Sequence, residues 1–89
     1  MISARNALNV IESQIERMST GSRVKIESFK KDRWLEILAL PDDKLELSEH
    51  GFLNRTLSMS RTEARGEIKR ILAREFPRSN MLRLHRSHG

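Results

Sequence analysis

The sequence contains no cysteine and no tyrosine, and its 89 residues include only one tryptophan and three phenylalanines. The lack of cysteine excludes disulfide bonds, thiolate catalysis and zinc sites built on thiolates, and it favours an intracellular, cytoplasmic setting. The scarcity of aromatic rings leaves Leu, Ile and Val to supply most of the core. The chain also lacks an apolar run of signal-peptide or membrane-spanning length, so we expect neither a signal nor a membrane partner.

The length predicts one small domain over residues 1–89, without internal repeats or a linker. A chain of this size buries only roughly 60 to 65 per cent of the surface that its unfolded form exposes. Hydrophobic residues form 37% of the chain and charged residues 33%, which is sufficient for a folded but thin core. A homodimer that covers an exposed apolar face would compensate for so small a core.

Hydrophobic periodicity predicts a helix and then three antiparallel strands in the first part of the chain. Apolar residues recur at helical spacing between Ala4 and Met18, with Ser3 as the cap and Gly21 beyond the end. Alternation with period two follows, interrupted by two polar turns. The predicted elements are a helix over about residues 4–19, strands over 23–29, 34–40 and 44–48, and turns at 30–33 and 41–43.

The second part of the chain predicts an edge strand, a helix and a last strand. Alternation over residues 53–59 includes Arg55 at an inward position, which indicates an edge strand with a bulge near Gly51. Ser60 and Glu63 fit a capping box, in which the glutamate reaches back to the amide of the cap residue. The helix that they start ends before Pro77. Residues 80–85 alternate again, so residues 80–89 are predicted to form a terminal strand and a frayed tail.

These elements predict an α+β fold in the order α-β-β-β-(β)-α-β. A two-layer sandwich, with an antiparallel sheet of three to five strands and both helices on one face, buries all the apolar stripes at once.

The positive charge is concentrated in the last third of the chain. Residues 1–59 contain nine basic and nine acidic side chains, whereas residues 60–89 contain eight basic and three acidic ones. Arg61, Arg65 and Lys69 are spaced four apart along one flank of the second helix, and none has an acidic partner on that flank. Arginine forks at a helix N-terminus favour a phosphate. The alternative is that these side chains only keep the domain soluble.

The start of the second helix resembles that of double-stranded RNA-binding domains. Residues 60–65 read Ser-Arg-Thr-Glu-Ala-Arg where those domains have Ser-Lys-Lys-x-Ala-Lys, and the order of helix, three strands and helix is also similar. The resemblance implies that basic residues of this helix contact phosphates across a groove of RNA. The sequence departs from that pattern at Thr62, at Gly66, in the Gly-rich lead-in, which residues 56–59 replace, and in the extra strand. We do not assign the chain to that family on so short a match.

A second basic cluster lies in the turn that precedes the only tryptophan. Lys30, Lys31 and Arg33 come directly before Trp34, which is therefore a candidate contact for an unpaired base at a sheet end. Phe29 and Phe52 offer the same chemistry, but we expect core packing to be their role.

The sequence predicts no enzyme, no metal site and no cofactor. Its histidines do not share a helical turn with one another, and no carboxylate pair completes a ligand set. Residues 42, 43, 46 and 49 are acidic, and we expect them to be solvated. No Gly-rich phosphate loop and no nucleophile motif occur in the sequence.

We therefore predict a small nucleic-acid-binding module, for RNA in preference to DNA because no helix-turn-helix or zinc signature is present. The N-terminal half of the second helix would contact the phosphates. The alternative is a protein-interaction or homodimerising domain. The predicted nucleic-acid contacts are Arg61, Arg65, Lys69, Arg78, Arg83, Lys30, Lys31, Arg33 and Trp34.

Overall fold

The computed structural model describes residues 2–77 and 81–87 of the chain. In chain order its elements are β1 (Ile2–Ser3), η1 (Ala4–Asn6, a 3-10 turn), α1 (Ala7–Arg17), β2 (Arg23–Glu27), β3 (Trp34–Leu40), β4 (Lys44–His50), β5 (Asn54–Ser60), α2 (Arg61–Glu75) and β6 (Met81–Ser87).

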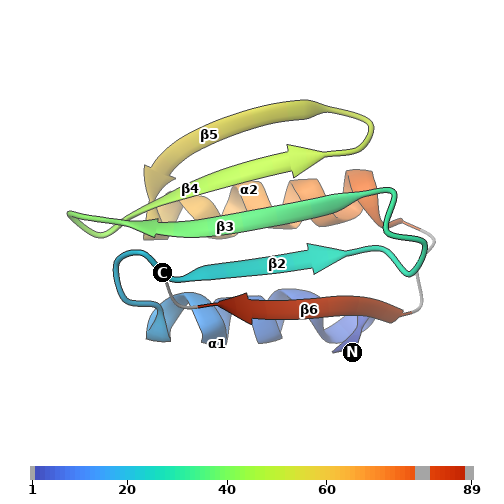
Figure 1. Cartoon of the computed structure of the whole chain (residues 1–89), viewed down its shortest axis with the longest axis horizontal. Coiled ribbons are helices and arrows are strands. Elements are labelled where there is room, and N and C mark those ends of the chain that lie inside the picture. Colours follow the sequence, from blue (N-terminus) through green and yellow to red (C-terminus); the bar gives the residue numbers. More distant parts are fainter. Residues whose placement is uncertain (1, 78–80, 88–89) are drawn as a thin grey trace.

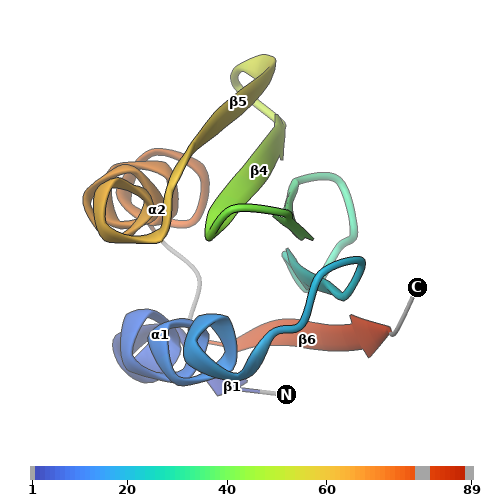
Figure 2. The same cartoon turned by 90° about the vertical axis from the view of Figure 1, so that its left-hand side faces the viewer.

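The strands form one antiparallel sheet in the order β1-β6-β2-β3-β4-β5. Both helices cover the same face of this sheet, as Figures 1 and 2 show. The predicted α+β class is thus confirmed, but the predicted number of strands is wrong because the sheet has six. The unexpected strand is β1, in which Ile2 and Ser3 pair with Leu82 and Met81. Two residues are too few to show a period, so the sequence could not indicate it.

The core lies between the sheet and the two helices. Alternation along β3 directs Leu35, Ile37 and Ala39 toward the helices, and all three are buried. Each fully buried Leu or Ile contributes roughly 1.5 to 3 kcal/mol relative to its exposed state. The helices and the other strands complete the core with Ala7, Ile11, Ile15, Val24, Ile26, Leu45, Leu47, Ala64, Ile68, Ile71, Phe76 and Leu82.

The strand predicted near the C-terminus lies inside the sheet, between β1 and β2. Arg83 to Ser87 pair with Glu27 to Arg23, so the strand continues two residues beyond the predicted end at position 85. The frayed-tail interpretation is therefore wrong for residues 86 and 87. Residues 88 and 89 lie outside the described residues, and so does the predicted contact Arg78.

The turns follow the sequence prediction with two corrections. Gly21 has a φ of 92°, and the Ser60 hydroxyl accepts a hydrogen bond from the amide of Glu63 at 3.2 Å. The Glu63 carboxylate, however, accepts from the Ser60 hydroxyl at 3.0 Å and not from the backbone of the cap residue. The strands β4 and β5 pair without interruption from Lys44 to His50, so the predicted bulge near Gly51 is replaced by a three-residue hairpin loop at 51–53.

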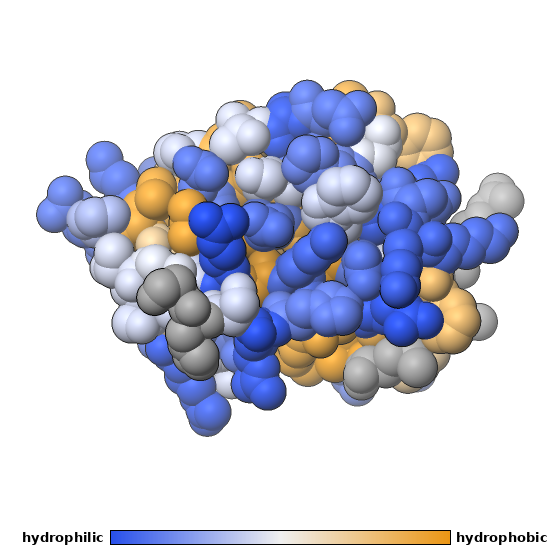
Figure 3. Space-filling model, in the orientation of Figure 1, coloured by the Kyte–Doolittle hydropathy of each residue, from blue (hydrophilic) through white to orange (hydrophobic). Residues whose placement is uncertain are grey.

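The second face of the sheet carries no helix, and we call it the open face. Figure 3 views the molecule from this side and shows a largely hydrophilic surface. Because side chains alternate along each strand, the open face takes the residues that do not point into the core. Its half-buried apolar members on β3 are Trp34, Leu38 and Leu40.

Candidate nucleic-acid interface

One row of paired residues crosses the open face from β6 to β5. The register aligns Arg83 with Glu27, Glu27 with Trp34, Trp34 with His50 and His50 with Asn54. Residues that are directly opposite in antiparallel strands project to the same face with Cβ atoms about 5 Å apart. Trp34 is the first residue of β3 but lies in the middle of this row, between polar neighbours on both sides.

Trp34 is held by stacking and by a cation. Its ring stacks on that of His50 with centroids 4.7 Å apart and planes inclined by 20°. The Nζ atom of Lys25 lies 4.9 Å from the centroid of the Trp34 ring, within the range of a cation-π interaction. Trp34 is half-buried, so a base could stack on its ring only by displacing His50 or Lys25.

Two further rings lie close to this row, and each is paired with an arginine. The guanidinium carbon of Arg83 is 4.7 Å from the centroid of Phe29, and that of Arg33 is 3.9 Å from the centroid of Phe52. Phe29 is 57% exposed and Phe52 is 63% exposed. The expectation that they pack in the core is wrong, because both lie in hairpin loops beyond the ends of the buried strands.

We call this region the aromatic end of the sheet, which is on the right in Figure 1. It gathers five of the predicted contacts from two segments that are distant in the sequence. Among its residues are five cationic side chains, and the carboxylates beside them are those of Glu27, Asp32 and Glu75. Its members are Lys25, Phe29, Lys30, Lys31, Arg33, Trp34, His50, Phe52 and Arg83.

The carboxylates of Asp32 and Glu27 each form a hydrogen bond with a neighbouring side chain. Asp32 accepts a hydrogen bond from the Ser28 hydroxyl at 2.7 Å, which lowers the pKa of Asp32. Burial would raise the pKa of Glu27, but the hydrogen bond with His85 at 2.8 Å and the charge of Lys25 lower it. Lys30 and Lys31 are exposed, and within residues 2–77 and 81–87 neither forms an ion pair. The positive charge of this loop therefore faces solvent.

The side chain of Arg61, on the predicted flank of α2, stabilises the end of another helix. Its guanidinium donates to the carbonyl oxygen of Ile15 and, at 2.9 Å, to that of Met18. It also forms an ion pair with Asp43 at 2.7 Å. Arg61 thus adds hydrogen bonds at the C-terminus of α1, where the carbonyl of Ile15 also accepts from the amide of Met18.

Arg65 and Lys69 occupy the rest of that flank. Arg65 forms an ion pair with Glu12 of α1 at 2.6 Å. Lys69 is exposed and has no ion pair within the part of the chain that the structure describes. The acidic partners of this flank come from α1 and from the β3-β4 turn, so they could not be found by examining the sequence of α2 alone.

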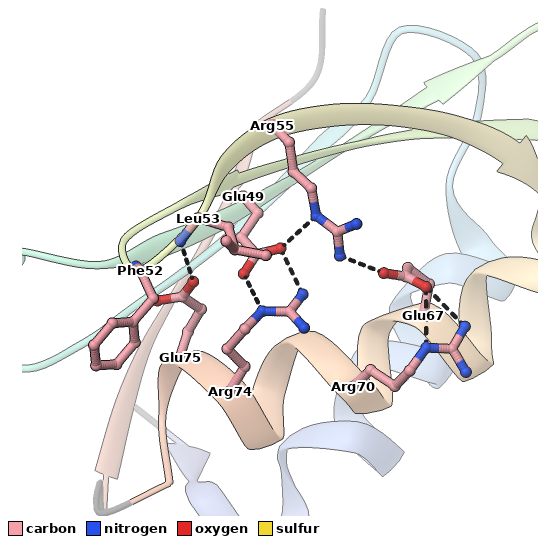
Figure 4. A network of polar contacts seen from close by, with 8 residues as sticks. All are labelled: Glu49, Phe52, Leu53, Arg55, Glu67, Arg70, Arg74 and Glu75. Carbon is pink, nitrogen blue, oxygen red and sulfur yellow. Dashed lines mark hydrogen bonds and ion pairs between the residues drawn. The ribbon is translucent and has the colours of Figure 1, made fainter.

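The inward side of β4 and β5 carries a buried charge network, shown in Figure 4. Arg74 donates from Nε and Nη2 to the two oxygens of Glu49, each at 2.9 Å, and Arg55 donates from Nε to Oε1 at 2.9 Å. Arg55 also contacts Glu67, which binds Arg70. The expectation that Glu49 is solvated is wrong, because it is the third inward residue after Leu45 and Leu47 and is only 1% exposed.

A second buried carboxylate connects α2 with the aromatic end. Glu75 is 2% exposed, and its carboxylate accepts hydrogen bonds from the amides of Phe52 at 2.8 Å and Leu53 at 3.2 Å. Its backbone carbonyl accepts from Arg33 at 3.2 Å. The end of α2 therefore fixes both the loop that bears Phe52 and the arginine that covers its ring. Helical spacing places Glu75 on the buried stripe, four residues after Ile71 and seven after Ile68, so the signal was a charged residue at an inward position.

Glu49 makes the stability of the fold depend on pH. Burial alone would raise its pKa, but hydrogen bonds from Arg74 and Arg55 lower it from 4.5 to about 2. A carboxylate with a depressed pKa stabilises the fold above its unfolded pKa and loses that contribution as the pH falls through its folded pKa. We expect about 3 kcal/mol of the free energy of unfolding to be lost between pH 4.5 and pH 2. Urea unfolding at pH 7, 4 and 3 measures this loss, and a Glu49→Gln variant should show a shallower dependence.

No group of three or more His, Cys, Asp or Glu side chains suited to a metal ion occurs among residues 2–77 and 81–87. Over the same residues, neither helix combines the length and the hydrophobicity that crossing a bilayer requires.

Comparison of the chain with protein-family models, with curated proteins and with solved structures gives no match.

Proposed function

We propose that this protein binds single-stranded nucleic acid at the aromatic end of the sheet, with RNA as the preferred ligand. The observation that carries the proposal is the gathering of three rings, each accompanied by a cation, beside two exposed lysines. Proteins that bind single strands combine aromatic platforms for bases with cationic side chains for phosphates. RNA is preferred because unstacked bases in loops and ends are its usual recognition elements.

The two kinds of side chain have separate effects on affinity. Stacking of a base on an aromatic ring contributes about 1–3 kcal/mol. Each phosphate that a cation neutralises adds about −0.7 to the slope of log K against log salt for a single strand. Contacts from Lys30, Lys31 and one arginine would therefore give a slope of about −2.

The first test uses Trp34 as its own reporter. The chain has one tryptophan and no tyrosine, so its emission reports the aromatic end without a label. We expect polyuridylate to change this emission at low salt and added salt to reverse the change. Phe29→Leu with Phe52→Leu should raise Kd by about 30-fold or more, because each leucine removes a π-face for stacking worth about 1–3 kcal/mol.

A matched pair of charge variants separates the aromatic end from the flank of α2. Lys30→Gln with Lys31→Gln removes two positive charges from the loop, and Arg65→Gln with Lys69→Gln removes two from α2. We expect only the loop variant to lose affinity and to reduce the salt slope by about 1. Loss of binding in the α2 variant alone would place the phosphates on that flank, and an unchanged Kd in the loop variant would exclude the aromatic end.

Homodimerisation is the second candidate function, and the edge strand β5 favours it. The outward residues of β5 are Asn54, Thr56, Ser58 and Ser60, none of them charged or proline, so Arg55 on the inward side is the charged residue of this edge. Light scattering at two protein concentrations distinguishes the candidates. Two results together would favour homodimerisation over nucleic-acid binding. The dimer would persist at high salt, and polyuridylate would not change the Trp34 emission.

A further inference from the structure

A pocket of about 500 Å³ opens where α1 ends and β2 begins. This place is at the opposite end of β2 from the aromatic end, about 13 Å away along the strand. Figure 2 views the molecule from this side, with the end of α1 and the head of the β6 arrow toward the viewer. The pocket is lined by Gln14, Arg17, Met18, Ser22, Arg23, Val24, Arg86 and Ser87.

Three arginines and no carboxylate line the pocket. Arg23 donates from one nitrogen, Nη1, to Glu36 at 3.1 Å, and Glu36 belongs to the open face and not to the lining. Arg17 and Arg86 form no ion pair within residues 2–77 and 81–87. The lining also has an amide from Gln14 and two serine hydroxyls, which are suited to hydrogen bonding with oxygen atoms.

Arg86 stands at an inward position of β6. Leu82, Leu84 and Arg86 alternate on the helix-facing side, and Arg86 is paired with the buried Val24. An arginine here interrupts the hydrophobic pattern of the strand, and its side chain is exposed at the rim of the pocket. Its Nη1 atom lies 3.4 Å from the amide oxygen of Gln14, which orients the group toward the pocket.

The C-terminus of α1 lies beside the pocket, and its carbonyl oxygens are engaged in hydrogen bonds. A helix C-terminus carries a partial negative charge because its last carbonyl groups have no intrahelical donors. In this protein the guanidinium of Arg61 donates to the carbonyls of Ile15 and Met18. Those hydrogen bonds occupy acceptors at the end of the helix next to the pocket, while Asp43 pairs with the same guanidinium.

We propose that this pocket binds a terminal phosphate group, a phosphomonoester, through Arg17 and Arg86, because the guanidinium of Arg23 is paired with Glu36 on the open face. Guanidinium groups bind phosphate oxygens with paired hydrogen bonds, and a terminal phosphate carries about −1.5 to −2 charge at pH 7. The volume lies within the range of small-molecule sites, so it admits more than the phosphate itself. A free nucleoside monophosphate and the 5′ end of a strand both present this group. The proposal does not depend on the nucleic-acid function of the aromatic end.

Calorimetric titration of the full chain with adenosine 5′-monophosphate at pH 7.5 tests the site. We expect saturable binding that adenosine does not show. Arg17→Gln and Arg86→Gln should each raise Kd at least about tenfold, because each removes a charged hydrogen-bonding partner. Arg5→Gln is the matched control, since Arg5 is exposed and lies outside the lining, and its Kd should stay within about twofold of the parent.

Two further titrations identify the source of the phosphate and distinguish binding at the pocket from binding at the aromatic end. Hexauridylate with a 5′-phosphate should bind more tightly than hexauridylate with a 5′-hydroxyl, and tighter binding than the monophosphate would identify a strand end as the source. Lys30→Gln with Lys31→Gln should leave the affinity for adenosine 5′-monophosphate unchanged. A failure of the pocket proposal is therefore distinguishable from a failure of the proposed function at the aromatic end.

The proposal is overturned if Arg17→Gln and Arg86→Gln bind adenosine 5′-monophosphate as tightly as the parent, or if adenosine binds equally well. An arginine that serves only to protect the edge of β6 would give another pattern. Arg86→Gln would then self-associate in light scattering while its affinity for the monophosphate remained at the parent value, and that result also overturns the proposal.

Discussion

Replacing Glu49 by Gln should lower the free energy of unfolding by about 2–3 kcal/mol. The substitution keeps the volume of the side chain but removes the carboxylate that receives two hydrogen bonds from Arg74 and one from Arg55. Arg74 would then lose its carboxylate partner, Arg55 would keep only Glu67, and both guanidinium groups are about a third exposed, which moderates the loss. Urea unfolding at pH 7, followed by circular dichroism, measures the effect.

The matched control is Glu46→Gln on the same strand. Glu46 belongs to the open face, is half-buried and forms no ion pair within the described residues, so we expect a change within about 0.5 kcal/mol. Equal effects of the two substitutions would show that the charge network of Figure 4 does not stabilise the fold.

Gly51→Ala should destabilise the protein by about 2–3 kcal/mol. A Cβ atom on Gly51 would lie 2.1 Å from Glu75 Oε1 and 2.8 Å from Glu75 Cδ, well inside contact distance. The carboxylate cannot move away without losing the amides of Phe52 and Leu53, and an unsatisfied buried polar group costs about 1–3 kcal/mol. Thermal unfolding measures the change, and the Trp34 emission shows whether the adjacent ring is disturbed.

Gly66→Ala is the control, and we expect it to change the stability in the opposite direction from Gly51→Ala. Gly66 lies on the exposed side of α2, where a Cβ would approach the Arg70 guanidinium no closer than 3.8 Å. Alanine is favoured over glycine inside a helix by about 0.5–1 kcal/mol, so this variant should be more stable than the parent. A Gly51→Ala protein as stable as the parent would contradict the role of Glu75 in fixing the loop.

The secondary structure was predictable where hydrophobic alternation is regular and turn residues are distinctive. The bounds 34–40 of β3 agree with the prediction, and Pro41 with two aspartates marks the turn that follows. The prediction fails at charged inward positions. Glu49 and Glu75 are buried because their partners come from other elements: Glu49 binds Arg55 and Arg74, and Glu75 binds the amides of Phe52 and Leu53. Those partners are not adjacent to them in the sequence.

The candidate site was predictable only in part, for the same physical reason. Lys30, Lys31, Arg33 and Trp34 are neighbours in the chain, so their clustering is already visible in the sequence. The partners of Arg61 and Arg65 come from Asp43 and Glu12, and only the packing of the helices brings them close. The arginine pocket was missed because its lining comes from three separate segments.

The position of β6 between β1 and β2 determines when the fold can be completed. This strand is the last in chain order, yet it pairs with residues 2 and 3 at one edge and with residues 23–27 at the other. Contacts between segments so far apart slow folding, because a long loop must close before they form. During synthesis on the ribosome, the edge of β2 would remain unpaired until residue 87 has emerged. Chains that end early would expose that edge and would be the species most prone to aggregation.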